Sequence, residues 1–234
     1  IEAQARFIRG FHHMEAIVHY NKVPFVDETV VELPAFAQLT NTADIWPRVE
    51  ADLKFAYDNL PGTQPQIGRV NKWAAGAMLA KAQMAQRKWA DARTLLQTVI
   101  EQGTTSGGAK YALQPRYGDV FRGENENGPE MVLTIQYTVG DGNAGANGNQ
   151  DAVLAHPHNN GPGGCCGFFQ PSQNLVNAYK TSANGLPLFD TFNQADVNNF
   201  LSTPNDLFYK GPLDPRLDWS VGRIGIPYLD WGPA

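Results

Sequence analysis

The feature that most constrains this fold is a helical periodicity that occurs four times in the first hundred residues. Apolar side chains recur at about i, i+4, i+7 and i+11, which is the spacing of one face of an amphipathic helix. The four stripes are Phe7, Phe11, Met14 and Val18; Val49, Leu53, Ala56 and Leu60; Trp73, Ala77, Ala80 and Met84; and Trp89, Ala92, Leu96 and Val99. Because no single helix can bury such a stripe alone, the pattern predicts helices that pack against one another.

The ends of these helices have local causes. Asp44 is placed to cap the second helix, with Pro47 in the first turn, where its missing N–H costs nothing. Asn71 is placed to cap the third helix, and Gly103 to end the fourth. Only Arg87-Lys88 separates the third and fourth helices, which predicts a tight antiparallel hairpin.

That hairpin resembles a tetratricopeptide unit, because Ala80 and Ala92 lie where the two helices would cross and Trp89 and Leu96 are bulkier fillers. A generic helical bundle that buries the same stripes stays open as an alternative. The predicted fold class is therefore mostly α, with tetratricopeptide-like helical hairpins in residues 1–105. We expect residues 106–234 to form a loop-rich, ligand-contacting region that contains short strands.

The composition of the second region supports this division. Of the 23 glycines, 13 fall between residues 103 and 164, and residues 140–164 carry almost no apolar side chain. Alternating polarity in residues 131–137 predicts one short, half-buried strand. A helix is expected from about Pro171-Ser172, ending before Asn184.

Charge and hydropathy exclude several classes of partner. The net charge is −5, no basic block occurs, and charged residues make up only 18% of the chain, so we expect no nucleic acid partner. No apolar run approaches the roughly 18 residues that span a bilayer. Polarity supplied by neutral amides and glycine suits neutral, polyhydroxylated ligands.

No pattern for catalysis, a cofactor or a metal stands out. Nucleophile elbows, phosphate loops and dinucleotide fingerprints are missing, and no pair among the carboxylates near residues 124–151 is singled out by its spacing. His12, Glu15 and His19 share a helical face without an HExxH pattern, and His156 and His158 lack further ligands. We therefore expect a protein that is not an enzyme and that carries no cofactor or metal.

Sugar recognition requires flat apolar faces together with fixed hydrogen-bonding groups. The aromatic residues Trp219, Tyr228 and Trp231 lie near the end of the chain, close to Asp218, and could form a stacking platform. Burial of these aromatic side chains in the core is the alternative. Further candidates for ligand contact are the amides of Asn159 and Asn160 and the rings of Phe168 and Phe169.

Several segments, in order, resemble the SusD/RagB family of outer-membrane nutrient-uptake lipoproteins. The resemblance begins with Ala5-Arg6-Phe7-Ile8-Arg9-Gly10-Phe11 and continues with Val23-Pro24-Phe25-Val26. Later segments are Gly68-Arg69-Val70-Asn71-Lys72-Trp73, Asn127-Gly128-Pro129-Glu130, Pro171-Ser172-Gln173-Asn174-Leu175 and Leu213-Asp214-Pro215-Arg216-Leu217. No single motif is specific, but their order and spacing extend over nearly the whole chain.

The resemblance implies a tetratricopeptide-like scaffold that binds a glycan without cleaving it. It also implies a cell-surface lipoprotein of the bacterial outer membrane, used in polysaccharide utilisation, that delivers its ligand to a TonB-dependent SusC-like transporter. The lipid anchor would lie upstream of Ile1, and N- and C-terminal family segments are expected outside this sequence. Two alternatives stay open: a glycoside hydrolase with carboxylates in the loops of residues 123–151, and a protein-interaction scaffold that binds no sugar.

Cys165 and Cys166 are the only cysteines, and they are adjacent. In the oxidising compartment that the resemblance implies, they can pair only with each other or across chains. A vicinal bridge would be strained, because Cα atoms about 3.8 Å apart fall short of the usual disulfide range near 5.5 Å. Two reduced, partly buried thiols are the other interpretation, and in both cases we expect this glycine-flanked loop to border the ligand site.

Overall fold

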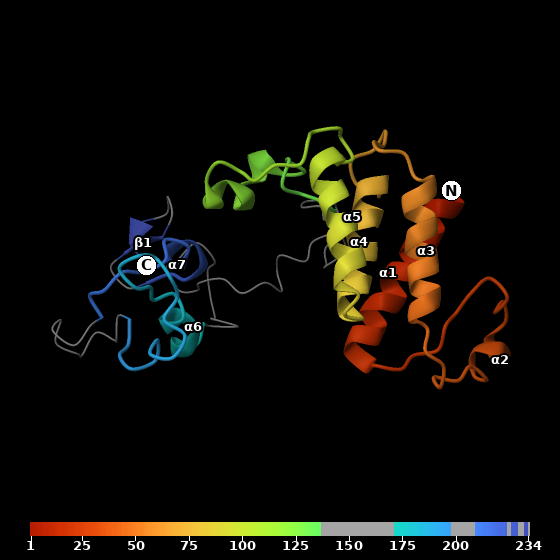
Figure 1. The fold of residues 1–234 in the computed structure, drawn as a ribbon, viewed down its shortest axis with the longest axis horizontal. Coiled ribbons are helices and arrows are strands. Elements are labelled where there is room, and N and C mark those ends of the chain that lie inside the picture. The colour runs from red at the N-terminus through yellow and green to blue at the C-terminus, as the bar shows by residue number, and fades with distance from the viewer. Residues whose placement is uncertain (137–170, 198–208, 224–225, 229–231, 234) are drawn as a thin grey trace, which may run out of the picture. The chain divides into compact units, whose positions relative to one another are not determined.

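The computed structural model describes residues 1–136, 171–197, 209–223, 226–228 and 232–233 (Figure 1). The chain separates into two compact units, residues 1–136 and residues 137–234. Each unit has its own hydrophobic cluster, and the two are described in turn. None of the described helices combines the length and the apolarity that a membrane crossing requires.

Four long helices make up most of the first unit. They are α1 (Glu2–Tyr20), α3 (Trp46–Asn59), α4 (Lys72–Ala85) and α5 (Trp89–Gln102), and the short α2 (Leu33–Phe36) lies in the connection between α1 and α3. Each long helix contacts the next along the chain: α1 packs on α3, α3 on α4, and α4 on α5 (Figure 1). The predicted mostly α fold is confirmed, as is the hairpin of α4 and α5.

The turn of that hairpin is held by backbone geometry. Arg87 adopts a left-handed conformation with φ of 62°. Its N–H donates to the carbonyl oxygen of Met84 (2.9 Å), and the N–H of Lys88 donates to that of Gln83 (2.9 Å). These two bonds are the Schellman pattern, in which orphan carbonyls at a helix end find partners. The chain therefore reverses within three residues.

The predicted helix boundaries are largely reproduced. The Oδ1 atom of Asn71 accepts from the N–H of Ala74 at 2.8 Å and caps α4, and Gly103 directly follows α5. Asp44 lies one residue before the N-cap position of α3, where its carboxylate accepts from the N–H of Trp46 at 3.0 Å. Pro47 lies in the first turn of that helix, as predicted.

The core of the first unit is built from one face of each helix. The buried face of α1 consists of Ala3, Phe7, Gly10, Met14 and Ile17. It shares a cluster with Val49, Leu53 and Ala56 of α3 and with Ala75 and Leu79 of α4. Burial of each large aliphatic side chain contributes about 1.5–3 kcal/mol, so this cluster is the main source of stability in the unit.

The registers of three helices differ from the predicted stripes. In α1, Ile17 is buried, whereas Val18 is 58% exposed. In α4 the buried residues are Ala74, Ala75, Gly76, Leu79, Ala80 and Ala82, whereas Met84 is exposed. Because α4 contacts both α3 and α5, it is buried on two sides and has no single stripe. In α5, Ala92 and Val99 are buried as expected, but Trp89 is 59% exposed at the start of the helix, so its placement in the core is wrong.

The predicted strand at residues 131–137 is also wrong, because none of residues 131–136 belongs to a strand. Both alternating sets are half-buried there, at Met131 and Leu133 as well as Val132 and Thr134. Two short 3₁₀ helices, Tyr117–Phe121 and Gly123–Asn125, precede this segment. Alternating polarity thus occurs here without a partner strand among the described residues.

The second unit contains α6 (Gln173–Asn177), α7 (Leu217–Ser220) and two short antiparallel strands, β1 (Pro227–Tyr228) and β2 (Gly232–Pro233). Ser172 caps α6 by accepting from the N–H of Leu175. The buried cluster of this unit comprises Val176, Val197, Leu217 and Val221. The boundary between the units differs from the expected one at residue 105, which rested on composition. Backbone contacts place residues 106–136 in the first unit, together with the long helices.

Candidate functional site

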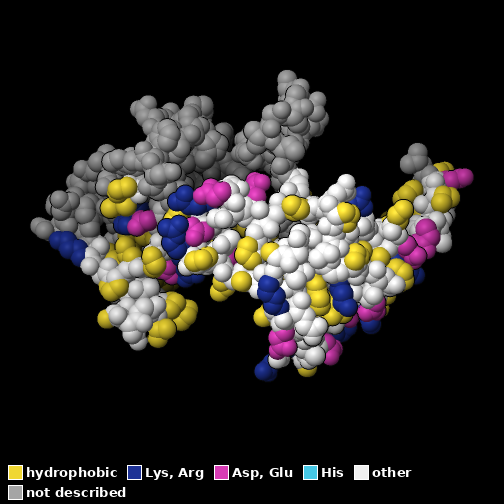
Figure 2. Space-filling view, turned by 90° about the horizontal axis from the view of Figure 1, so that it is seen from above, with side chains coloured by type: hydrophobic (Ala, Val, Ile, Leu, Met, Phe, Trp, Pro, Cys, Tyr) yellow, Lys and Arg dark blue, Asp and Glu magenta, His cyan; other side chains and the backbone are white. Residues whose placement is uncertain are grey.

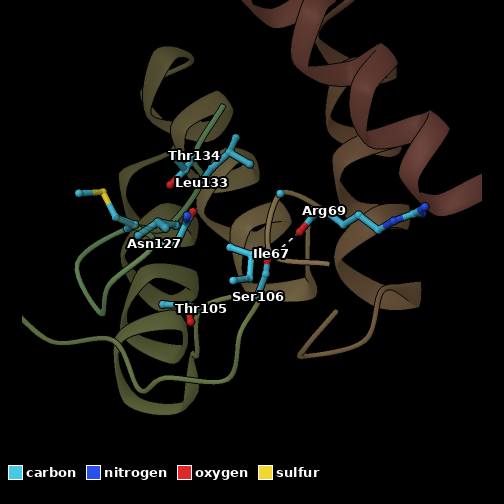
Figure 3. Close-up of a pocket in the computed structure, with 10 residues that line it drawn as sticks. Ile67, Arg69, Thr105, Ser106, Asn127, Leu133 and Thr134 are labelled. Atoms are coloured by element: carbon cyan, nitrogen blue, oxygen red, sulfur yellow. Dashed lines mark hydrogen bonds between the residues drawn. The ribbon is translucent and has the colours of Figure 1, made fainter. Parts of the chain in front are cut away.

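A small polar pocket lies in the first unit where three chain segments meet (Figure 3). The segments are the connection between α3 and α4, the chain that follows α5, and residues 127–134. The lining residues are Ile67, Gly68, Arg69, Thr105, Ser106, Asn127, Met131, Val132, Leu133 and Thr134. The enclosed volume is about 20 Å³, which is room for roughly one water molecule.

Asn71 and Ser106 hold the first two walls together. The Nδ2 atom of Asn71 donates to the carbonyl oxygens of Gly62 (2.9 Å) and Thr104 (2.8 Å). The hydroxyl of Ser106 donates to the carbonyl oxygen of Arg69 at 2.6 Å, as the dashed line in Figure 3 shows. Because Asn71 is fully buried and also caps α4, the pocket wall is fixed to the helical core.

The third wall is held by polar contacts on both sides of residues 127–136. Asn127 has a left-handed backbone with φ of 58°. Its Oδ1 atom accepts from the side-chain amide of Gln136 at 2.8 Å. Glu130 accepts from the N–H of Gln114 at 2.8 Å, which ties this wall to the chain after α5. A non-glycine residue in this region of φ is uncommon and persists only where the surroundings enforce it.

Tyr111 lies at the base of the same region. Its hydroxyl donates to the carbonyl oxygen of Val132 at 3.4 Å, a long bond. Burial raises the pKa of Tyr111 to about 12, because the phenolate would lose hydration. Tyr111 is therefore a neutral packing group at all physiological pH values.

The pocket presents neutral hydrogen-bonding groups. The side chain of Arg69 points away from the cavity in Figure 3, and its guanidinium donates to Gln66 and to Gln4. No other lining residue is ionisable. Such an arrangement can bind hydroxyl or amide groups of a neutral ligand, and it offers no acid or base for catalysis.

A separate polar centre joins α1 to α3. The carboxylate of Asp52, which is only 2% exposed, accepts from Nε of Arg6 at 2.8 Å and from Nε of Arg9 at 2.6 Å. Arg9 also pairs with Glu28. The hydrogen bond to the carboxylate of Asp52 raises the pKa of Arg9 above its ordinary value. Both arginines stack on rings, Arg6 on Phe55 and Arg9 on Phe25, which makes this centre a structural tie between helices.

Only some of the residues that the sequence predicts for a ligand platform lie among the described residues. Asp218 and Trp219 lie side by side in α7, and Asp218 forms a bidentate pair with Arg223 at 2.7 and 3.0 Å. Trp219 is half-buried. Tyr228 lies in β1, where its backbone pairs with Gly232. The side chain of Tyr228 and the whole of Trp231 lie outside the part of the chain that the structure describes.

The remaining predicted residues also lie outside the described residues. They are Asn159, Asn160, Cys165, Cys166, Phe168 and Phe169. Their roles stay predictions. Within the described ranges, no group of three or more His, Cys, Asp and Glu side chains is placed to hold a metal ion.

The polar pocket and the Asp52 centre were not predicted. The three pocket walls are remote in sequence, so no local pattern marks them. The sequence does contain a signal for the Asp52 centre. Two arginines lie three residues apart on one helix, and a carboxylate lies beside the apolar stripe of the next long helix. These groups can meet when the two helices pack.

Comparisons with known proteins agree on one family, although no family model matches the chain. A SusD-like protein of Formosa agariphila, P25, is 26% identical over an alignment of 166 residues that covers 67% of this chain and 30% of that protein. A SusD-like protein of Bacteroides ovatus is 26% identical over an alignment of 147 residues that covers 58% of this chain and 26% of that protein. The chain thus spans less than a third of the length of these curated relatives.

Solved structures show the same likeness. A laminarin-binding SusD-like protein is 26% identical, with a TM-score of 0.52 over 58% of this chain and 30% of its own. A SusD-like protein of Bacteroides fragilis has the same fold at 19% identity, with a TM-score of 0.66 over 92% of this chain and 41% of its own. The resemblance found in the sequence is confirmed: this chain is similar to SusD-like proteins in sequence and in fold.

Proposed function

We propose that this protein binds a glycan without cleaving it and delivers it to a TonB-dependent SusC-like transporter. It would act at the bacterial cell surface as an outer-membrane lipoprotein of a polysaccharide-utilisation system. The observation that carries the proposal is the likeness to the laminarin-binding SusD-like protein. Because the chain spans under a third of that protein, its ligand and its transporter are proposals for this chain.

The charge distribution supports a neutral ligand. In Figure 2, Lys and Arg side chains and Asp and Glu side chains are interspersed on the face that is drawn, and neither sign dominates the described part. The pocket near Thr134 is neutral as well. Binding should therefore depend on stacking and hydrogen bonds rather than on ion pairing.

The direct test is calorimetric titration of the protein with a panel of polysaccharides. The panel contains laminarin, xylan, amylose and mannan as neutral members, and polygalacturonate as an anionic one. We expect binding to at least one neutral member, with little change between low and high salt. Binding of polygalacturonate alone, with a steep loss in salt, would contradict the proposal.

The same mixtures separate binding from hydrolysis. After overnight incubation, chromatography should show intact polysaccharide. A glycoside hydrolase needs two carboxyl groups about 5–9.5 Å apart across the scissile bond, and it would release shorter products. Product release at a rate proportional to protein concentration would replace the proposal by the enzymatic alternative.

The proposed platform can be tested with a matched pair of tryptophans. Trp219→Ala removes the half-buried ring beside Asp218, and Trp89→Ala removes an exposed ring on α5. We expect the first change to weaken glycan binding and the second to leave it unchanged. Equal affinities for both variants would remove Trp219 from the site. The double change Cys165→Ser and Cys166→Ser tests in the same way whether that loop borders the ligand, and glycan affinity is again the quantity measured.

The transporter partnership has its own test. Affinity purification of the full-length protein from solubilised outer membranes should recover a TonB-dependent SusC-like transporter. A protein that binds glycan but recovers no transporter would keep the binding proposal and remove the delivery step.

A further inference from the structure

The hydroxyl of Thr134 lines the polar pocket without a hydrogen-bond partner among the described residues. The backbone N–H groups of Val132 and Leu133 likewise have no partner there. Half-buried polar groups normally pair with protein or with ordered water. These unpaired groups therefore require a partner from solvent or from a ligand.

Thr105 adds a second hydroxyl on the opposite wall. It is 4% exposed, and its Oγ1 atom accepts from the N–H of Ala109 at 3.1 Å. A threonine hydroxyl has one proton to donate besides its acceptor lone pairs. No acceptor for that proton occurs among the described residues.

The size of the pocket limits what can fill it. A volume of about 20 Å³ accepts one water molecule or one group of similar size. The cavity is too small for a polypeptide strand. Such a strand would have to run for several residues beside a strand of this protein, about 4.8 Å away from it. A sugar hydroxyl has the right size, and like water it both donates and accepts.

The surroundings of the pocket decide the class of sugar. Arg69 points away and is bonded to glutamines, so no cation is directed at an anionic group. Ile67 is 54% exposed and Met131 half-buried, and both lie on the lining, where they offer apolar contact for the C–H face of a sugar ring. Without an aromatic side chain on the lining, the affinity of this contact alone should be low.

We infer that the pocket formed by Ile67–Arg69, Thr105–Ser106 and Asn127–Thr134 is a saccharide subsite for a neutral glycan. One sugar hydroxyl enters the cavity and bonds with the hydroxyl of Thr134. The inference rests on the proposed glycan-binding function and adds a contact in the helical unit, separate from the platform near Trp219.

The test compares Thr134→Val, Thr134→Ser and Thr94→Val in the complete 234-residue chain. Thr134→Val removes the unpaired hydroxyl and keeps the side-chain shape, while Thr134→Ser keeps the hydroxyl. Thr94 is an exposed residue of α5 whose hydroxyl donates to the carbonyl oxygen of Ala90, so Thr94→Val makes the same chemical change away from the pocket. Calorimetry uses laminarin and the other neutral polysaccharides of the panel.

We expect Thr134→Val to weaken binding about two- to tenfold, the range for one net hydrogen bond. Thr134→Ser and Thr94→Val should bind as the wild type does. The melting temperature of Thr134→Val should not fall, because the hydroxyl that it removes has no protein partner among the described residues.

Two outcomes would overturn the inference, and they can be told apart. If the wild type binds a neutral polysaccharide and Thr134→Val binds it equally, the pocket holds only structural water and the proposed function stands. If the wild type binds no member of the panel, both the subsite and the proposed function fail.

Discussion

At the scale of single residues, Asp52 is the carboxylate on which the packing of α1 against α3 most depends. Its side chain is nearly fully buried and accepts three hydrogen bonds from Arg6 and Arg9. Asp52→Ala should lower the free energy of unfolding by about 3 kcal/mol, because it leaves two guanidinium groups without their buried partner. Urea unfolding followed by circular dichroism measures the loss.

The control for that prediction lies in the same helix. Asp58 pairs with Lys54 at 2.7 Å on the exposed side of α3. Asp58→Ala should cost no more than about 0.5 kcal/mol, as is usual for exposed pairs. Similar losses for the two variants would mean that the buried ion pair does not stabilise the unit.

Tyr111 predicts a pH dependence at alkaline pH. In the unfolded chain its phenol loses the proton near 10, whereas burial raises the pKa in the folded state to about 12. Between these values the folded state binds more protons, so stability falls as pH rises through the window. Phenolate absorbance during a pH titration should show a late transition that is lost in Tyr111→Phe and kept in Tyr20→Phe, the exposed control.

At the scale of elements, Asn71 connects three segments. Its Oδ1 atom caps α4, and its Nδ2 atom donates to the carbonyl oxygens of Gly62 and Thr104. Asn71→Ala should lower the free energy of unfolding by about 3 kcal/mol, of which about 1 kcal/mol is the cap and the rest the two buried carbonyls. Asn71→Asp keeps the cap acceptor but places a buried carboxylate oxygen against both carbonyl oxygens, so we expect a loss in urea unfolding at least as large as that of Asn71→Ala.

The comparison with Ser172 separates the cap from the other two bonds. Ser172 caps α6 through a single bond to the N–H of Leu175. Ser172→Ala should therefore cost about 1 kcal/mol, a typical value for a helix cap. An equally small loss for Asn71→Ala would show that its bonds to Gly62 and Thr104 contribute nothing.

The elements also show how far sequence reasoning extends. The helices around Asn71 and Gly103 could be predicted, because caps, stripes and turn residues are local signals. The register of α4 could not, since a helix covered on two sides carries no single stripe. The strand expected at residues 131–137 failed for a related reason: a strand needs a partner, and alternating polarity says nothing about where one lies.

The candidate site was less predictable than the helices. Its walls come from three segments, near residues 68, 105 and 131. These segments meet only because the packing of α3, α4 and α5 brings the loops at the ends of the helices together. Gly68 illustrates the point: a Cβ atom there would lie 2.9 Å from Cγ of Gln136, a residue far away in the sequence. By contrast, the resemblance to SusD-like proteins could be recognised from the sequence, because it lies in the order of many weak motifs.

At the scale of the whole molecule, the position of the boundary between the two units leads to the last prediction. A fragment of residues 1–136 should fold alone and unfold cooperatively, because its hydrophobic cluster, including Leu133, lies within it. A fragment of residues 1–105 keeps the four long helices but loses Tyr111, which packs near Gly103, and Leu133.

We therefore expect the longer fragment to unfold at a clearly higher urea concentration than the shorter one. The slope of its unfolding transition should also be steeper, since more surface is exposed on unfolding. Circular dichroism at matched concentrations measures both. Equal midpoints would place the boundary near residue 105, where the change in composition suggested it, and would mean that residues 106–136 gain nothing from contact with the helices. A higher midpoint for the longer fragment would instead show that the pocket walls at residues 127–134 are part of the helical unit, as a rigid subsite requires.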